Sequence, residues 1–145
     1  MTRIQWQSAF ETGIPEVDNQ HRKFVGFINR LEDLAGAGEA ADPSVLRSVM
    51  ADLVNYANYH FAFEQNMQQE IGFSDSQAHL ARHMEILDWL KERLVDPSPQ
   101  SELGLVELLS CLMDWFLRHV LVEDMRFGRE YARMLQGSDS GTVVV

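Results

Sequence analysis

Cysteine is nearly absent from the sequence, and long apolar runs are missing altogether. Cys111 is the single cysteine, which excludes a disulfide within the chain and is typical of a reducing compartment. No apolar run approaches the roughly 20 residues that a membrane-spanning helix needs. The opening segment, MTRIQWQSAF, also lacks the apolar centre of a signal peptide. These absences predict a cytoplasmic protein with no membrane partner.

Positive charge is also scarce. The chain has 12 lysines and arginines against 22 aspartates and glutamates, a formal net charge of -10. Proteins that bind phosphate groups need a basic surface, so we expect neither nucleic acid nor an anionic membrane surface as a partner. Strand-like alternation of polar and apolar residues is missing over any useful length.

Apolar residues recur three and four positions apart in four segments, which predicts four helices. An early glycine and proline oppose helix, so we expect residues 1–17 to form an irregular arm and Asp18 to cap the first helix. Asp42 followed by Pro43 is a start signal for the second helix, and Gly72 should end it.

Four amphipathic helices with short connections favour an all-α fold, an antiparallel up-down-up-down four-helix bundle. We expect it to carry the N-terminal arm and a short C-terminal helical extension. Residues 1–136 would then form a single domain, and residues 137–145 a disordered tail.

Histidine and acidic residues interrupt the apolar stripes of these helices. Every histidine in the chain lies on a stripe that should face the core, and two acidic side chains accompany them. The seven positions are His21, His60, Glu64, His79, His83, His119 and Asp124. A single such histidine is most simply a core residue. Burying all seven without a metal would leave many polar groups unsatisfied.

The order of these residues along the chain predicts that they meet. They fall early in the first and third helices and late in the second and fourth, which lie at the same end of an up-down-up-down bundle. Residues four apart, such as His79 and His83, share a helical face. His119 and Asp124 are five apart, which a regular helix rotates by about 140°. Either the helix loosens there, as in a π-type turn, or Asp124 lies past its end.

Five imidazoles and two carboxylates are too many donors for one ordinary ion, so they suit two metals with bridging carboxylates. Imidazole with carboxylate favours Fe, Zn, Cu or Mn over Mg or Ca. No cysteine belongs to the set, which argues against a structural thiolate zinc site. Cys111, two turns before His119, is interpreted as a small buried hydrophobe near the core.

The motifs around these residues resemble the ligand set of the hemerythrins. They read HFAFE from His60, HLARH from His79 and HVLVED from His119, preceded by DNQH ending at His21. The early tryptophan and the stretch TGIPEVDNQH resemble the bacterial members in particular. The resemblance covers residues 4–131, nearly the whole chain.

This resemblance implies two iron ions joined by an oxo or hydroxo bridge. One iron would take three histidines and the other two, with both carboxylates bridging. The implied ligands are His79, His83 and His119 for one iron, His21 and His60 for the other, and Glu64 and Asp124 for the bridges.

The iron with two histidines would be one ligand short, and O2 would bind at that open position. NO, azide or other small anions are further ligands that the resemblance allows there. The pocket around it would be lined by Trp6, Phe61, Trp115, Phe116 and Val120. The implied function is reversible dioxygen binding for storage, delivery or buffering, by a monomer that is not an enzyme.

Two alternatives stay open at this point. A sensor of O2, NO or redox state would need a separate partner, because no signalling module accompanies the helices. A weak di-iron oxidase or peroxidase would be expected to use paired Glu-x-x-His motifs, and the chain contains none.

Gln65 and Ile86 depart from the residues usual in hemerythrins. Neither is an implied ligand, so the departures affect oxygen affinity rather than iron binding.

Overall fold

The structure, a computed structural model, describes residues 4–36, 42–95 and 102–144, with only the backbone described at 95, 102–105 and 137–144. Within these ranges the chain forms helices and no strand. The elements are the 3-10 helix η1 (Ser8–Phe10), α1 (Pro15–Gly36), α2 (Pro43–Ile71), α3 (Ser76–Val95), α4 (Glu102–Arg118), the π-helix η4 (His119–Asp124) and α5 (Met125–Val144).

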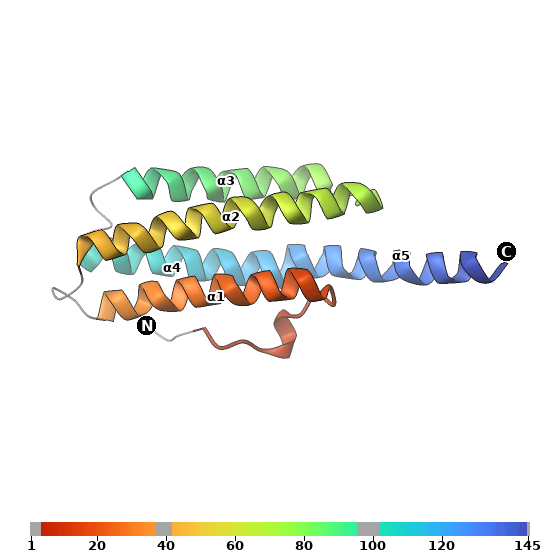
Figure 1. The fold of residues 1–145 in the computed structure, drawn as a ribbon, viewed down its shortest axis with the longest axis horizontal. Helices are drawn as coiled ribbons and strands as arrows, with labels where there is room; N and C mark the ends of the chain where they lie inside the picture. The colour runs from red at the N-terminus through yellow and green to blue at the C-terminus, as the bar shows by residue number, and fades with distance from the viewer. Residues whose placement is uncertain (1–3, 37–41, 96–101, 145) are drawn as a thin grey trace.

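The helices α1 to α4 lie side by side along one long axis (Figure 1). α1 contacts α2 and α4, and α2 contacts α3. α4, η4 and α5 follow one another in a single line, and α5 extends beyond the other helices. The expectation of an all-helical bundle is confirmed. None of the described helices combines the length and the apolar character needed to cross a membrane.

The predicted ends of α2 are confirmed. The Asp42 side chain accepts a hydrogen bond from the backbone N–H of Ser44 at 2.8 Å, and Pro43 occupies the first helical position. Both features stabilise a helix start. Gly72 ends the helix with φ of 67°, a left-handed conformation that glycine adopts without steric cost.

The predicted start of α1 is wrong. The helix begins at Pro15 rather than after Asp18, because proline's fixed φ suits the first turn of a helix. Asp18 lies inside that turn and does not cap it. Its carboxylate instead accepts hydrogen bonds from the backbone N–H and the hydroxyl of Thr12, both at 2.8 Å, and from the N–H of Gly13 at 3.3 Å. Asp18 therefore ties the N-terminal arm to α1.

Two apolar clusters form the core. The large apolar cluster joins buried side chains of all four bundle helices, among them Phe24, Phe61 and Phe116. The small apolar cluster consists of Ile14, Val17, Phe73 and Phe127. The predicted metal ligands are flanked by both clusters, since the ring centroid of His83 lies 4.0 Å from that of Phe61 and the centroid of His79 lies 6.1 Å from that of Phe73.

The C-terminal extension is the helix α5. Its backbone continues as helix to Val144, where the composition suggested a disordered tail over residues 137–145. The side chains of that segment, and all of Val145, lie outside the described residues. The boundary of the domain at residue 136 therefore stays a prediction.

Candidate metal centre

The structure brings all seven predicted ligands together in the interior of the bundle. None of their side chains is more than 2% exposed. They come from α1 (His21), α2 (His60 and Glu64), α3 (His79 and His83) and η4 (His119 and Asp124). The bundle therefore places five imidazoles and two carboxylates where water is excluded.

A π-helix places the last two predicted ligands, which are five residues apart, on the same helical face. The segment from His119 to Asp124 is a π-helix between two α-helices, and its i→i+5 hydrogen bonding returns the sixth residue to the face of the first. The Asp124 carboxylate consequently reaches His119, with Oδ1 3.0 Å from Nε2. Of the two arrangements that the sequence left open, the loosened helix is the one present.

The seven side chains form two overlapping groups, in each of which one ligand atom per residue lies within 4.8 Å of the others. The carboxylates of Glu64 and Asp124 belong to both groups. The remaining members are His79, His83 and His119 in one group and His21 and His60 in the other. Two metal positions that share two carboxylates are the simplest occupancy of this arrangement.

Asp124 stands at the centre of the cluster. Its Oδ1 lies 2.9 Å from Nε2 of His79, and its Oδ2 lies 2.9 Å from Nε2 of His21. Glu64 spans the cluster in the same way, with Oε2 3.0 Å from Nε2 of His60 and Oε1 3.0 Å from Nε2 of His79. Each carboxylate therefore faces histidines of both groups with different oxygens, as a bridging ligand must.

Several of these short contacts are not hydrogen bonds. Both oxygens of Asp124, Oε2 of Glu64, and Nε2 of His21 and of His79 are buried without a hydrogen-bond partner among the described residues. Such atoms are costly to bury, and ligand atoms of these residues lie within 4.8 Å of one another in each group. A cation between them would satisfy all of these atoms at once, so the residues fit a metal centre.

Aromatic rings pack against the histidines. Phe61 stacks on His83 with centroids 4.0 Å apart, and Trp115 stacks on His119 with centroids 4.8 Å apart. Phe116 meets His21 edge to face at 6.0 Å. These contacts bring three of the predicted pocket residues to the site and make its surroundings apolar.

The other two predicted pocket residues differ from each other. Val120 is 1% exposed and belongs to the π-helix, next to His119. Trp6 packs on Phe10 at 5.5 Å and under the guanidinium of Arg22 at 4.7 Å. No described ring contact joins Trp6 to a ligand histidine, so its place in the pocket stays a prediction.

Two residues that hold the histidines from behind were missed by the sequence reasoning. Nδ1 of His60 donates to Oε1 of Gln20 at 2.6 Å, and Nδ1 of His119 donates to Oε2 of Glu123 at 3.0 Å. Such partners fix the ring and leave Nε2 free for a metal. Glu123 was open to prediction, because it follows His119 by four residues. Gln20 contacts a residue 40 positions away, which no local spacing indicates.

Burial and charge shift the pKa values within the cluster in opposite directions. Burial lowers the pKa of His83 to about 3. Burial also disfavours charge on His79 and His119, but contacts with the carboxylates outweigh it and raise their pKa values to about 9 and about 10. Burial raises the pKa of Glu64 and Asp124 too, yet the neighbouring histidines bring both below their usual range. The carboxylates and these two histidines therefore each favour the charged form of the other.

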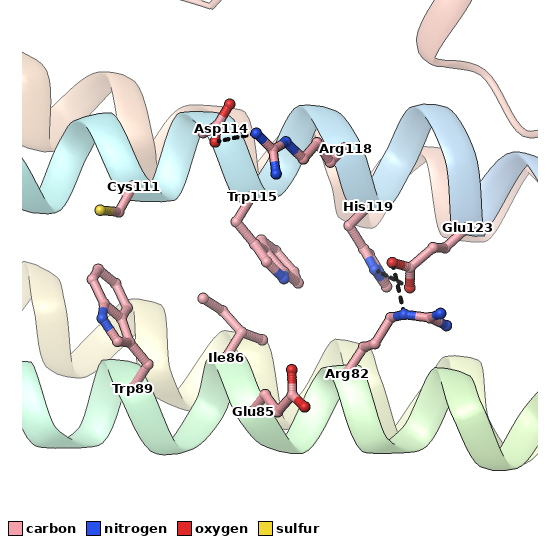
Figure 2. A pocket seen from close by; sticks show the side chains of 10 residues that line it. All are labelled: Arg82, Glu85, Ile86, Trp89, Cys111, Asp114, Trp115, Arg118, His119 and Glu123. Carbon is pink, nitrogen blue, oxygen red and sulfur yellow. Dashed lines mark hydrogen bonds and ion pairs between the residues drawn. The ribbon is translucent and has the colours of Figure 1, made fainter.

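A groove of about 410 Å³ between α3 and α4 reaches the edge of the cluster (Figure 2). Trp89 from α3 and Trp115 from α4 line it with apolar rings, and His119 and Glu123 lie at one end of it. Cys111 lines the groove and is exposed, so the interpretation of it as a buried hydrophobe is wrong.

Residues 12–131 match the protein family described as the hemerythrin HHE cation binding domain. The matched segment contains all seven predicted ligands and every element from α1 to η4.

Curated relatives are similar over most of the chain. Bacteriohemerythrin of Pseudomonas aeruginosa (strain LESB58) is 32% identical over 124 residues, which are 86% of this chain and 78% of that protein. Bacteriohemerythrin of Stenotrophomonas maltophilia (strain R551-3) is 25% identical over 127 residues, 88% of this chain and 80% of that protein. A bacteriohemerythrin of Clostridium acetobutylicum is 25% identical over 128 residues, 87% and 96% of the two chains.

Proposed function

Since the chain belongs to the hemerythrin family, we propose that its buried cluster holds two iron ions and binds dioxygen reversibly. Iron agrees with the donor set, because imidazole and carboxylate suit this metal among others. When bound, two irons would supply the electrons that dioxygen takes up on binding and returns on release. O2 storage, delivery or buffering is the corresponding role, and it requires no turnover of a substrate.

The single observation that carries the proposal is the unequal division of the histidines. The two groups share Glu64 and Asp124, but one adds three histidines and the other only His21 and His60. The metal position beside these two histidines therefore has one protein ligand fewer than the other position. A small molecule that reaches the cluster would find its free coordination position there, and O2 and azide would compete for it.

The apolar surroundings explain why binding would be reversible. Phe116 packs edge to face on His21, and Phe24 packs on His60 with centroids 5.2 Å apart. Both phenylalanines are buried, with 1% and 4% exposed. These rings leave little room for water beside the open position, and water or protons there would promote irreversible oxidation of the metal.

The order and direction of the helices belong to this proposal. We take the bundle as antiparallel and up-down-up-down, preceded by the N-terminal arm and followed by α5. The colours of Figure 1 support this order, since the chain reverses direction between successive helices from α1 to α4. With this topology His21 and His79, near the starts of α1 and α3, meet His60 near the end of α2.

Repeated oxygen cycling tests the proposal. The iron-loaded protein is reduced without oxygen, exposed to O2 and returned to inert gas while its visible charge-transfer absorption is followed. We expect a band that grows with O2, disappears when O2 is removed and is suppressed by added azide. Permanent conversion to a ferric spectrum at the first exposure would contradict reversible binding, and hydrogen peroxide release would then indicate an oxidase.

A further inference from the structure

His60 and His119 both donate from Nδ1, and their partners differ in charge. His60 donates to the neutral amide oxygen of Gln20, whereas His119 donates to the carboxylate of Glu123. His60 belongs to the ligand group with two histidines and His119 to the group with three. The negative charge of Glu123 therefore acts on the metal position with three histidines, through His119.

The π-helix makes this arrangement possible. Glu123 and Asp124 are neighbours in the chain, yet both reach the same imidazole from opposite sides. Glu123 contacts Nδ1 of His119 at 3.0 Å, and Asp124 contacts Nε2 at 3.0 Å. A regular α-helix would keep the first contact and turn the second residue away by about 140°. The π-helix retains Glu123 as a partner while it adds Asp124 as a ligand.

A third residue holds Glu123 from the opposite helix. Nε of Arg82, on α3, lies 3.1 Å from Oε1 of Glu123, while Oε2 of the same carboxylate accepts from His119. Figure 2 shows the three side chains in line at the end of the groove, with Arg82 reaching across from α3. Arg82 is 47% exposed, and an ion pair at such a surface adds little to stability. Its effect is to orient the carboxylate.

We propose that Glu123, oriented by Arg82, is a positioning residue that fixes the ring of His119 and makes it the stronger electron donor of the two partnered histidines. A carboxylate partner on Nδ1 sets the tautomer and raises the basicity of Nε2, and an amide does so less. The inference rests on the proposed metal centre. It adds that the metal position with three histidines is the more electron-rich and stabilises the ferric state more strongly.

Variants of Glu123 separate the charge from the hydrogen bond. Glu123→Gln keeps an acceptor and removes the charge, whereas Glu123→Ala removes both. Arg118→Gln is the matched control, because Arg118 pairs with Asp114 at 3.1 Å in the same groove and touches no ligand. Helix content by circular dichroism checks that every variant is folded.

The first measurement is the affinity for Co(II) in a titration against a competing chelator, which needs neither iron nor oxygen. We expect Glu123→Ala to weaken one of the two binding steps by about 10–100-fold and to leave the other unchanged. Glu123→Gln should weaken that step less, and Arg118→Gln should bind as the wild type does. Equal weakening of both steps, or of neither, would overturn the inference.

The second measurement is the ferric/ferrous midpoint potential of the iron-loaded protein. Loss of the negative charge in Glu123→Gln should shift the potential to more positive values. Arg82→Lys, which keeps the positive charge but loses the planar guanidinium that orients the carboxylate, should shift it in the same direction by less. An unchanged potential in Glu123→Gln would show that the residue only packs against the ring. Wild-type protein that fails to bind two Co(II) ions would contradict the metal centre itself, and the inference would fall with it.

Discussion

Phe116 is a buried side chain on the two-histidine side of the cluster, where it packs edge to face on His21. We expect Phe116→Ala to speed autoxidation, because the space that it leaves beside His21 admits water. The rate is measured as the loss of the oxygenated absorption band in air.

Phe127→Ala is the control for this prediction. Phe127 is equally buried but belongs to the small apolar cluster, where its described ring partners are Phe73 and Tyr131. Both substitutions should destabilise the fold by roughly 3–5 kcal/mol. The same autoxidation rate in both variants would mean that cavity formation, and not access of water to the site, controls the oxidation.

His79 and His119 carry raised pKa values of about 9 and about 10. Both are therefore protonated at pH 7 in the metal-free protein, and both must lose that proton to bind a metal. We expect metal binding to release protons and to strengthen as the pH rises toward 9. Titration calorimetry in two buffers of different ionisation enthalpy measures the release. Identical heats in both buffers would contradict the protonated state.

The buried cluster of seven candidate ligands could be predicted from the sequence, because polar residues on apolar stripes violate the pattern of a bundle and so stand out. Of the two residues behind them, Glu123 was open to prediction from its spacing of four from His119, but Gln20 was not. Gln20 is placed beside His60 by the packing of α1 on α2. This contact follows from no helical period, so tertiary structure alone defines this partner.

At the scale of the elements, the arm packs against the start of α5 at Gly128. A Cβ atom added there would lie 2.2 Å from the backbone oxygen of Thr12, while the same addition at Gly26 on α1 meets nothing within 4 Å. Gly128→Ala should therefore destabilise the protein by about 1–3 kcal/mol through this overlap.

Gly26→Ala is the matched substitution in open space. It should stabilise the protein by up to about 1 kcal/mol, because alanine favours helix over glycine. Urea unfolding of both variants measures the two changes. Stabilisation by both would mean that the arm moves away from α5 without cost.

Some helix ends are determined by residues at the end itself, and others depend on contacts with distant segments. Asp42 and Gly72 fix the ends of α2 through their own hydrogen bond and backbone conformation, and both were predicted. The start of α1 was placed too late, because Pro15 was interpreted as opposing helix although proline is compatible with a first turn. Asp18 was assigned as a cap for the same reason, whereas its hydrogen bonds with the arm determine its place.

At the scale of the whole molecule, the cluster joins α1, α2, α3 and η4 around atoms that lack partners without a metal. Metal binding should therefore stabilise the whole fold, by roughly 2.7 kcal/mol when free metal is at 100 times its dissociation constant. Thermal unfolding with and without a chelator measures this. Asp124→Ala is the control, since it loses a shared ligand and its melting temperature should respond less to the chelator. An equal response of both proteins would place the metal elsewhere.

Seven side chains are proposed to form two metal positions with shared carboxylates. The iron content of reconstituted protein, freed of loosely bound metal and measured per chain, tests this most directly. We expect two iron ions per chain in the wild type and fewer in Asp124→Ala, which loses a shared ligand. One iron per chain in the wild type, or two in the variant, would contradict a centre in which Asp124 bridges two metals.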